Sequence, residues 1–203
     1  MSLRANHIGF RYERADWLFR GLHATIEPGE VVGLQGPSGT GKSTLARILA
    51  GYERPTEGTV TLSNEPLPLR GYNPVQLVLQ HPEKAVNPRW RMREVLYEAG
   101  EPDPELLDAL GIRPEWLDRW PNELSGGELQ RFCVARALGN AGTKFLIADE
   151  MTTMLDAITQ AQLWHAVTRR AKQREIGVLV VSHERALLER LCSRTIRLQQ
   201  YRM

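Results

Sequence analysis

Residues 36–43 carry the residue types and the spacing of a phosphate-binding loop. They read Gly-Pro-Ser-Gly-Thr-Gly-Lys-Ser, between an apolar run and a segment that predicts a helix. Glycines let the backbone curl so that N–H groups point at phosphate oxygens, and the helix N-terminus adds positive potential. Lys42 would bring a positive charge to the β- and γ-phosphates of a nucleotide, and Ser43 a hydroxyl to Mg²⁺. A glycine-rich turn that binds nothing is the weaker interpretation.

A second candidate for chemistry is the apolar run Phe145–Ala148, which ends in the carboxylates of Asp149 and Glu150. Ligands of open parallel sheets bind beyond the carboxyl ends of the strands, so we expect Asp149 beside the phosphate loop. Asp149 could hold Mg²⁺, and Glu150 could polarise an attacking water as a general base. Two merely solvated carboxylates are the alternative, which a phosphate loop in the same chain disfavours.

The third motif is the segment 124–131, which reads Leu-Ser-Gly-Gly-Glu-Leu-Gln-Arg. Ser125 and Glu128 have the spacing of a capping box, in which each side chain binds the other residue's backbone N–H. A capped helix start with two glycines also offers free N–H groups and a hydroxyl to an anion. Both interpretations can hold together. Nothing within one chain obviously lets Ser125 and Lys42 share one phosphate.

These motifs need a scaffold, and the remaining sequence predicts one in which strands and helices alternate. Strands are expected at 7–12, 22–26, 31–35, 59–62, 76–79, 145–148, 178–181 and 195–198, and helices at 42–50, 92–99, 104–110, 125–138, 156–173 and 184–191. This alternation is typical of a parallel sheet with helical crossovers. The first 30 residues favour antiparallel strands. The segment 81–124, rich in Pro, Trp, Arg and Glu, predicts an inserted helical lobe.

Length and composition fit one globular domain. The chain has 203 residues, of which 42% are hydrophobic and 25% charged. Because 26 basic residues face 24 acidic ones, a nucleic-acid binder is disfavoured, although a local basic patch stays open. Cys133 and Cys192 match no metal or redox spacing, so we expect two reduced thiols. We see no secretory leader, and the apolar runs are too short to cross a bilayer, so any membrane role would be that of a soluble partner.

Together the motifs resemble those of ABC-type ATPase subunits. Gly36–Ser43 matches the Walker A loop, Phe145–Asp149 the Walker B strand, and Leu124–Glu128 the family signature. The resemblance implies an α/β fold: a P-loop NTPase (RecA-like) core with a mainly parallel sheet, an N-terminal antiparallel β-subdomain and a small inserted helical subdomain. The implied domains are a single ATPase unit over 1–203, with the core and β-subdomain in 1–80 and 125–203 and the helical subdomain in 81–124.

The resemblance also gives roles to residues outside the motifs. Gln80 matches the Q-loop glutamine that touches Mg²⁺, and His183 the switch histidine near the γ-phosphate. Asp156 matches the end of the D-loop at the dimer interface, and Tyr12 the aromatic that stacks on adenine. An ordinary histidine, and a tyrosine packed in the β-layer close to Phe10, are the alternatives for His183 and Tyr12.

The full set of implied site residues can be stated by role. The ATP-binding residues would be Tyr12, Gly36, Pro37, Ser38, Gly39, Thr40, Gly41, Lys42, Ser43 and Thr44. The metal ligands would be Ser43, Gln80 and Asp149, and the catalytic residues Glu150, His183 and Lys42. The signature would be Ser125, Gly126, Gly127 and Glu128, acting on ATP held by another subunit.

The function implied by the resemblance is hydrolysis of ATP, with Mg²⁺, to power a membrane transporter through head-to-tail dimerisation. The partners would be transmembrane permease subunits and a second ATPase subunit, either a copy or a related chain. The protein would be cytoplasmic and peripheral on the inner face of the membrane, with no nucleic acid expected. The alternatives are a soluble ABC-type ATPase acting on nucleic acid or ribosomes, and a scaffold that binds ATP without turnover. Intact Lys42, Asp149, Glu150 and His183 argue against the scaffold.

Two stretches, 78–89 and 152–162, resemble the peptide and nickel importer branch, which implies peptide or nickel uptake. Met151 stands where the family usually has Pro, and Met154 where it usually has Ala. That branch normally continues past the last ATPase strand, whereas this sequence ends at Met203.

The inserted lobe begins with a group of large side chains close behind Gln80: Trp90, Arg91, Met92, Arg93 and Tyr97. In the family this place receives a helix of the membrane protein, so we expect these residues in a partner groove. Alternatively, Trp90 and Met92 form the lobe's own core. Trp116 and Trp120 are expected to pack, and the basic run 169–174 to be a solvated helix face.

Overall fold

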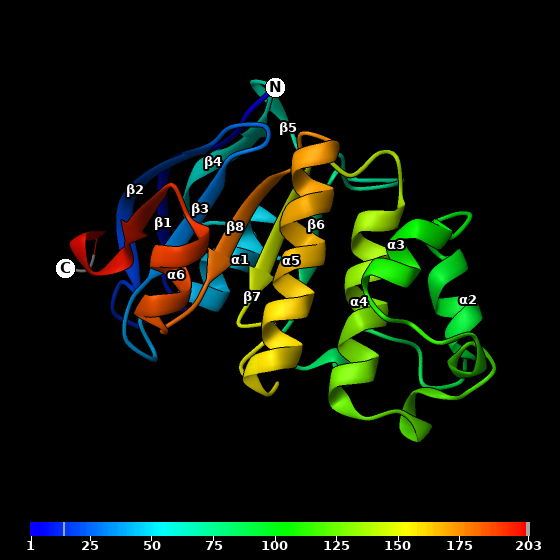
Figure 1. The fold of residues 1–203 in the computed structure, drawn as a ribbon. Coiled ribbons are helices and arrows are strands. Elements are labelled where there is room, and N and C mark those ends of the chain that lie inside the picture. The colour runs from blue at the N-terminus through cyan, green and yellow to red at the C-terminus, as the bar shows by residue number, and fades with distance from the viewer. Residues whose placement is uncertain (14, 202–203) are drawn as a thin grey trace.

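The computed structural model describes residues 1–13 and 15–201 and builds them around two sheets (Figure 1). The parallel sheet contains, in spatial order, β6 (Val75–Val78), β7 (Phe145–Asp149), β8 (Gly177–Val181), β3 (Val31–Gln35) and β9 (Arg194–Arg197). The antiparallel sheet contains β2 (Phe19–Ile26), β1 (Leu3–Phe10), β4 (Glu57–Leu62) and β5 (Glu65–Pro66). The α-helices are α1 (Lys42–Leu49), α2 (Met92–Tyr97), α3 (Pro104–Ala109), α4 (Gly126–Gly139), α5 (Ala157–Gln173) and α6 (Arg185–Leu191), and the 3₁₀-helices are η1 (Pro82–Lys84), η2 (Pro114–Trp116), η3 (Pro121–Glu123) and η4 (Leu198–Tyr201). This is the predicted α/β fold.

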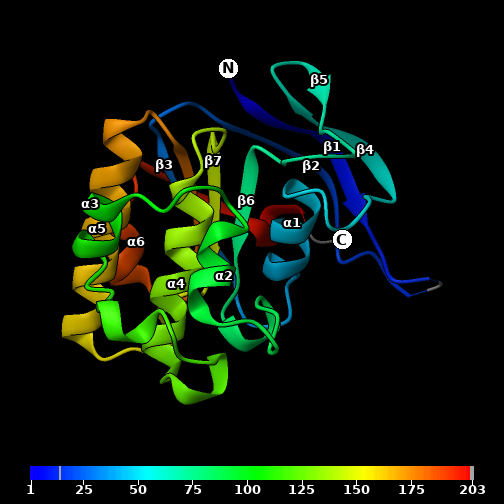
Figure 2. The same cartoon turned by 90° about the vertical axis from the view of Figure 1, so that its right-hand side faces the viewer.

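Both faces of the parallel sheet are buried, and alternate side chains of its strands enter two cores. On β7, Phe145 and Ile147 join the core that contains α1 and the antiparallel sheet, whereas Leu146 and Ala148 join the core of α4, α5 and α6. Figure 2 shows α1 on one side of the sheet and α4 and α5 on the other. A strand covered on both faces has no polar side to show, which explains the continuous apolar run in its sequence.

The helices expected within 81–124 lie at one side of the molecule, next to α4 (Figure 1). Their packing residues are apolar and belong to the same core as α4: Met92, Val95 and Leu96 from α2, and Leu106 and Leu110 from α3 and its end. The lobe therefore contacts the parallel sheet through α4.

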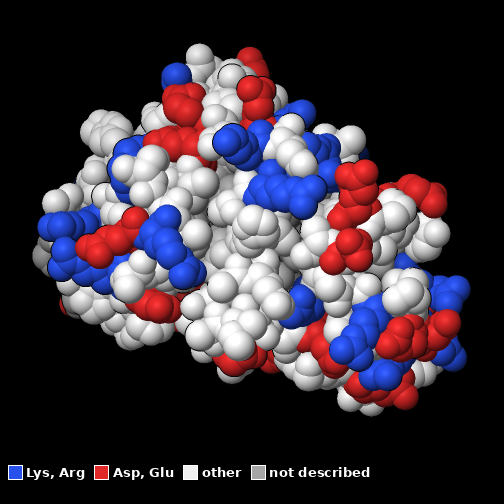
Figure 3. Space-filling view, viewed as in Figure 1, with Lys and Arg blue, Asp and Glu red and all other residues white. Residues whose placement is uncertain are grey.

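The surface over α5 is divided by charge (Figure 3). Basic side chains gather toward its C-terminal end, while the surface over its N-terminal half is uncharged. The run 169–174 is a solvated face only in part: Arg169 and Lys172 are exposed, whereas the side chain of Arg170 is 15% exposed and pairs with Asp103. No helix in the described part of the chain has both the length and the apolar character needed to span a membrane.

All the predicted strands and helices occur, with ends displaced by a few residues. The largest displacement is in the first strand, predicted over 7–12 and found as β1, because a register shift lies between Ala5 and Ile8. The bulge contains His7 at a φ of 52° and breaks the alternation of buried and exposed side chains on which the prediction relied. Tyr12 therefore lies beyond the strand.

One expectation about the inserted lobe is wrong. Met92 has no exposed surface and belongs to the core, so it cannot face a partner groove. Trp90 packs half-buried against the same core, as the alternative interpretation has it. Tyr97 is 56% exposed. Trp120 is also partly exposed, with the guanidinium of Arg91 lying 4.9 Å from its ring centroid.

The replacement Met92→Ala should lower the free energy of unfolding by about 2–5 kcal/mol, because it leaves a cavity in a close-packed core. Tyr97→Ala, on the exposed side of the same helix, should cost much less, under about 1 kcal/mol. Urea denaturation followed by far-UV circular dichroism measures both. Equal losses in the two variants would contradict the placement of Met92.

Candidate functional site

The phosphate loop connects β3 to α1, and its conformation depends on glycine at Gly41. This residue has a φ of 95°, and a Cβ there would lie 2.5 Å from Leu18 Cδ2. Gly39 also has a positive φ, 76°, but a Cβ there would meet no described atom within 4 Å. The positive φ angles thus constrain the backbone of the loop. At Gly41 the side chain of Leu18, from the connection between β1 and β2, constrains it as well.

Lys42 lies inside the loop, with only 6% of its surface exposed. Its Nζ donates hydrogen bonds to the carbonyls of Gly36 at 2.9 Å and Pro37 at 3.1 Å. Glu150 Oε1 lies 3.9 Å from the same nitrogen. An ammonium has three N–H donors, so Lys42 is fixed at the point where phosphate oxygens would enter the loop.

The carboxylate at the end of β7 meets the end of the loop. Ser43 Oγ donates to Asp149 Oδ1 at 3.1 Å. Asp149 is 4% exposed, and its burial raises the pKa of the carboxyl above its usual range. A buried carboxylate favours a nearby cation, because water no longer stabilises its charge. The expected pair of Ser43 and Asp149 is therefore brought together.

Glu150 follows in a strained conformation, with a φ of 49°. Its N–H donates to the carbonyl of Val181 at 3.0 Å, and its Oε1 lies 3.3 Å from Nδ1 of His183. A positive φ in a residue other than glycine is typical of functional positions. The structure thus brings together Glu150, His183 and Lys42, which the sequence proposes as catalytic residues.

A cavity of about 330 Å³ extends from this cluster to Tyr12. It is lined by Tyr12, Leu18, Ser38, Gly39, Gly41, Lys42, Ser43, Thr44 and Glu150. The hydroxyl of Tyr12 shares a 2.9 Å hydrogen bond with Thr44 Oγ1, its ring lies edge-on to Phe10 at 4.9 Å, and 54% of the residue is exposed. Sequence reasoning missed Leu18, whose only signal is an apolar residue between the polar loop and β2.

Gln80 is not joined to Ser43 or Asp149 by a hydrogen bond in the described chain. Its Nε2 donates to Thr153 Oγ1 at 3.1 Å, and that hydroxyl donates to the carbonyl of Glu150 at 3.0 Å. The structure therefore connects Gln80 to the turn after β7 rather than to the expected metal ligands.

The signature lies elsewhere. Ser125 Oγ accepts from the N–H of Glu128 at 3.3 Å, and Glu128 Oε2 accepts from the N–H of Ser125 at 2.8 Å, so the predicted capping box starts α4. A cavity of about 340 Å³ lies beside it, lined by Arg113, Trp116, Ser125, Gly127, Glu128, Arg131, Met154, Leu155, Asp156 and Thr159. No lining residue is common to this cavity and the one at the phosphate loop.

Asp156 also has a structural role, because its side chain caps α5. Oδ1 accepts from the N–H groups of Ile158 and Thr159, each at 3.0 Å, and Oδ2 from the hydroxyl of Thr159 at 2.7 Å. These hydrogen bonds, that of the Thr159 hydroxyl foremost, hold the pKa of Asp156 below its usual range. The carboxylate stays charged beside the signature cavity.

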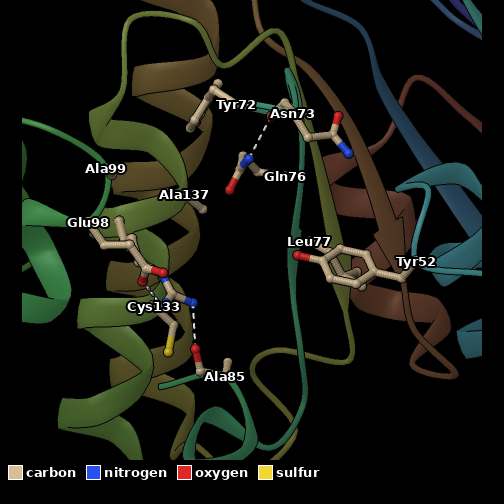
Figure 4. A pocket seen from close by; sticks show the side chains of 12 residues that line it. Tyr52, Tyr72, Asn73, Gln76, Leu77, Ala85, Glu98, Ala99, Cys133 and Ala137 are labelled. Carbon is tan, nitrogen blue, oxygen red and sulfur yellow. Dashed lines mark hydrogen bonds and ion pairs between the residues drawn. The ribbon is translucent and has the colours of Figure 1, made fainter. Parts of the chain in front are cut away.

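A larger groove of about 550 Å³ opens between β6 and α4 (Figure 4). Tyr72, Asn73, Gln76 and Leu77 line it from β6 and the turn before it, Ala85, Glu98 and Ala99 from the helical lobe, Cys133, Arg136 and Ala137 from α4, and Tyr52 and Gly71 from loops. Arg136 donates to Glu98 at 2.9 Å and to the carbonyl of Ala85 at 2.8 Å. The groove combines aromatic rings with an ion pair, and the motifs of the sequence did not reveal it.

Comparison with known proteins identifies chains of similar sequence. The profile of the family described as ABC transporter matches residues 19–153. The chain is 38% identical to the nickel import ATP-binding protein NikE of Rhodospirillum rubrum over an alignment of 200 residues. This alignment covers 87% of this chain and 70% of the relative.

Solved structures agree in fold. One described as an ATP binding subunit of an ABC transporter superposes with a TM-score of 0.84 at 21% identity, covering all of this chain and 88% of the other. A dimeric bacterial ABC transporter cassette, MJ0796, superposes with a TM-score of 0.79 at 23% identity, and the superposition covers 96% of this chain and 93% of the other. At these identities the likeness establishes the fold alone, and it confirms the fold class predicted from the sequence.

The constraint at Gly41 predicts a difference between two neighbouring glycines. Both Gly39→Ala and Gly41→Ala strain a positive φ, but only Gly41→Ala also places a methyl group against Leu18. We expect Gly41→Ala to weaken binding of a fluorescent ATP analogue at least about tenfold more than Gly39→Ala. Equilibrium fluorescence titration measures the difference, and equal affinities would contradict the constraint.

Proposed function

Because the chain belongs to the ABC transporter family of ATP-hydrolysing subunits, we propose that it powers an importer by closing with a second subunit around ATP. One observation carries the proposal: the phosphate loop and the signature occupy separate cavities of the same chain. Each cavity is half of a nucleotide site. Two subunits arranged head to tail would bring each loop to the other's signature and produce two equivalent sites.

ATP binding follows from the cavity at the loop. The triphosphate would enter the loop, where Lys42 already lies among backbone carbonyls, and the helix N-terminus of α1 adds positive potential. At the other end, the ring of Tyr12 is held by Thr44 and exposed toward the cavity, which suits stacking on adenine. Leu18 would add an apolar wall between the two ends.

The residues at the end of β7 fit Mg²⁺. Hydroxyl and carboxylate oxygens are the ligands that this cation prefers, and Ser43 and Asp149 offer both at one point with phosphate oxygens close by. When bound, Mg²⁺ would neutralise phosphate charge. Gln80 would have to leave Thr153 before it could join them.

For hydrolysis, we propose that Glu150 Oε1 accepts the proton of the attacking water. His183 Nδ1 and Lys42 Nζ lie 3.3 Å and 3.9 Å from this oxygen and orient the carboxylate. Accepting the proton there makes the water a better nucleophile, which is general-base catalysis. Lys42 and the loop N–H groups stabilise charge on the phosphates, and the exclusion of water by the second subunit strengthens these interactions.

The groove between β6 and α4 is our candidate seat for the permease. Exposed Tyr52 and Tyr72 line it, and aromatic residues are enriched in protein interfaces. Docking there would hold the protein on the cytoplasmic face of the membrane. The name of the Rhodospirillum rubrum relative supports nickel as the cargo, and uptake of radioactive nickel by cells with and without this protein would test that.

The variant Glu150→Gln should bind ATP, dimerise and stall, because the amide cannot accept the proton of water while its shape is unchanged. Size-exclusion chromatography with light scattering, with and without Mg-ATP, measures the dimer. Phosphate release should fall at least about a hundredfold. Near-normal turnover would sink the assignment of Glu150.

A charge placed in the signature should separate binding from closure. Ser125→Arg should leave ATP affinity of the monomer unchanged, because Ser125 lines no part of the loop cavity. It should abolish the ATP-dependent dimer in a Glu150→Gln protein. An unimpaired dimer of the double variant would show that the signature does not face the other subunit's ATP.

A further inference from the structure

Three side chains of α4 donate hydrogen bonds to one face of the segment that carries Gln80. Gln130 Nε2 donates to the carbonyl of Leu79 at 3.1 Å, Cys133 Sγ to that of Pro82 at 3.9 Å, and Arg136 Nη2 to that of Ala85 at 2.8 Å. Donor and acceptor are 51 residues apart in every pair. We call these three bonds the ladder.

The matching spacing has a physical cause in the local structure of the 79–85 segment. Three residues of α-helix rise about 4.5 Å, whereas three residues of strand extend about 10 Å, so a strand would lose register after one bond. The chain bends at Gln80 after the strand ends, and between Pro82 and Ala85 the 3₁₀-helix η1 shortens it further, since three of its residues rise about 6 Å. The carbonyls can therefore follow the donors of α4.

Two of the three donors are held away from water, and the third, Arg136, is mostly covered where it lines the groove. Gln130 is 2% exposed and Cys133 3%, and the side chain of Arg136 is 20% exposed. Burial raises the pKa of the Cys133 thiol to about 11, so the thiol keeps its proton at neutral pH. A second feature marks Gln130: its Oε1 is buried without a hydrogen-bond partner in the described chain. A buried amide oxygen without a partner costs stability, so the bond that Gln130 donates to Leu79 matters the more for holding this side chain in place.

The ladder joins three places that the proposed function uses. Its first bond adjoins Gln80, which reaches the turn of Glu150 through Thr153. Its last bond joins Arg136 to the carbonyl of Ala85, and both residues line the groove between β6 and α4 (Figure 4). Arg136 also pairs with Glu98 there. The helix that supplies the donors begins at Ser125, the signature serine.

We infer that Gln130 and Arg136 are positioning residues that fix the 79–85 segment to α4, so that the groove, Gln80 and Ser125 move as one body. This inference rests on the proposed function, because it explains how a partner in the groove would control the closing of the dimer. All three hydrogen bonds can stay intact only if the 79–85 segment and α4 move together without sliding past each other. Without them, Ser125 and Gln80 would reach their places independently, and closure would lose the advantage of orientation.

The test compares Gln130→Leu and Arg136→Met with a matched control, Arg174→Met. Arg174 donates to the carbonyl of Leu138 at 3.2 Å, so the control also removes an arginine bond at α4 but leaves the ladder intact. In Glu150→Gln protein, we measure affinity for a fluorescent ATP analogue, ATP-driven dimerisation by light scattering, and hydrogen exchange of the amides in 79–85. In protein with Glu150 intact, we measure kcat and KM for ATP.

For both ladder variants we expect the ATP affinity of the monomer, measured at protein concentrations too low for dimerisation, to be unchanged. Dimerisation and kcat should each be about tenfold lower, the loss expected from one hydrogen bond to or from a buried group. Exchange in 79–85 should accelerate. Arg136→Lys should restore much of the dimer, because its ammonium can still donate to Ala85. The control should resemble the parent protein.

If the ladder variants dimerise with ATP as strongly as the parent protein, with dimerisation constants within about twofold, the inference is overturned. So would an equal loss in the control, since that would mean a general weakening of α4. If the parent itself fails to bind ATP or to dimerise, the proposed function is wrong, and hydrogen exchange in 79–85 still decides whether the ladder holds the segment.

Discussion

Parallel pairing of the central strands is the constraint on which the site depends. The register aligns Leu34 of β3 with Val181 of β8, and Val181 with Asp149 of β7. Because all three strands point the same way, their carboxyl ends reach one edge together, and the chain must leave the sheet there in three loops. The phosphate loop follows β3, Glu150 directly follows β7, and His183 is the second residue after β8. A shift of one residue in either pairing would turn Asp149 away from Ser43.

This edge concentrates charge in a place with little water, and the charges are arranged to compensate one another. Lys42 is buried but has two carbonyls and a nearby carboxylate; Asp149 is buried but accepts from Ser43. An unpaired charge at this depth would cost several kcal/mol. Glu150 differs, since it is strained in its backbone and only partly exposed, and its carboxylate contacts two nitrogens that lie on different loops. Strain and fixed partners hold this carboxylate in one orientation.

Much of this could be predicted from the sequence, because the informative residues are local in the chain. Three motifs can each be recognised within eight residues of sequence: the loop of residues 36–43, the carboxylates after an apolar strand, and the capping box of Ser125. The structure brings the first two together. Met92 and Leu18 could not be placed, because their surroundings come from packing between distant segments. The ladder is less visible still, since its partners are 51 residues apart and its donors look like ordinary residues of a buried helix.

The start of α4 confirms the capping interpretation of the signature, but capping does not explain both of its glycines. A capping box needs Ser125 and Glu128, and both bonds are present. It does not need glycine at the two positions between them. Gly127 has a packing reason, because a Cβ there would lie 3.0 Å from Leu155 Cδ2, but no described atom lies within 4 Å of a Cβ at Gly126. Glycine in a helix costs up to about 1 kcal/mol relative to alanine, and no described atom of this subunit requires glycine at Gly126. A bare backbone facing open space beside a hydroxyl and helix N–H groups suits the close approach of an anion from outside the subunit, which is the approach that a nucleotide held by a second subunit would make.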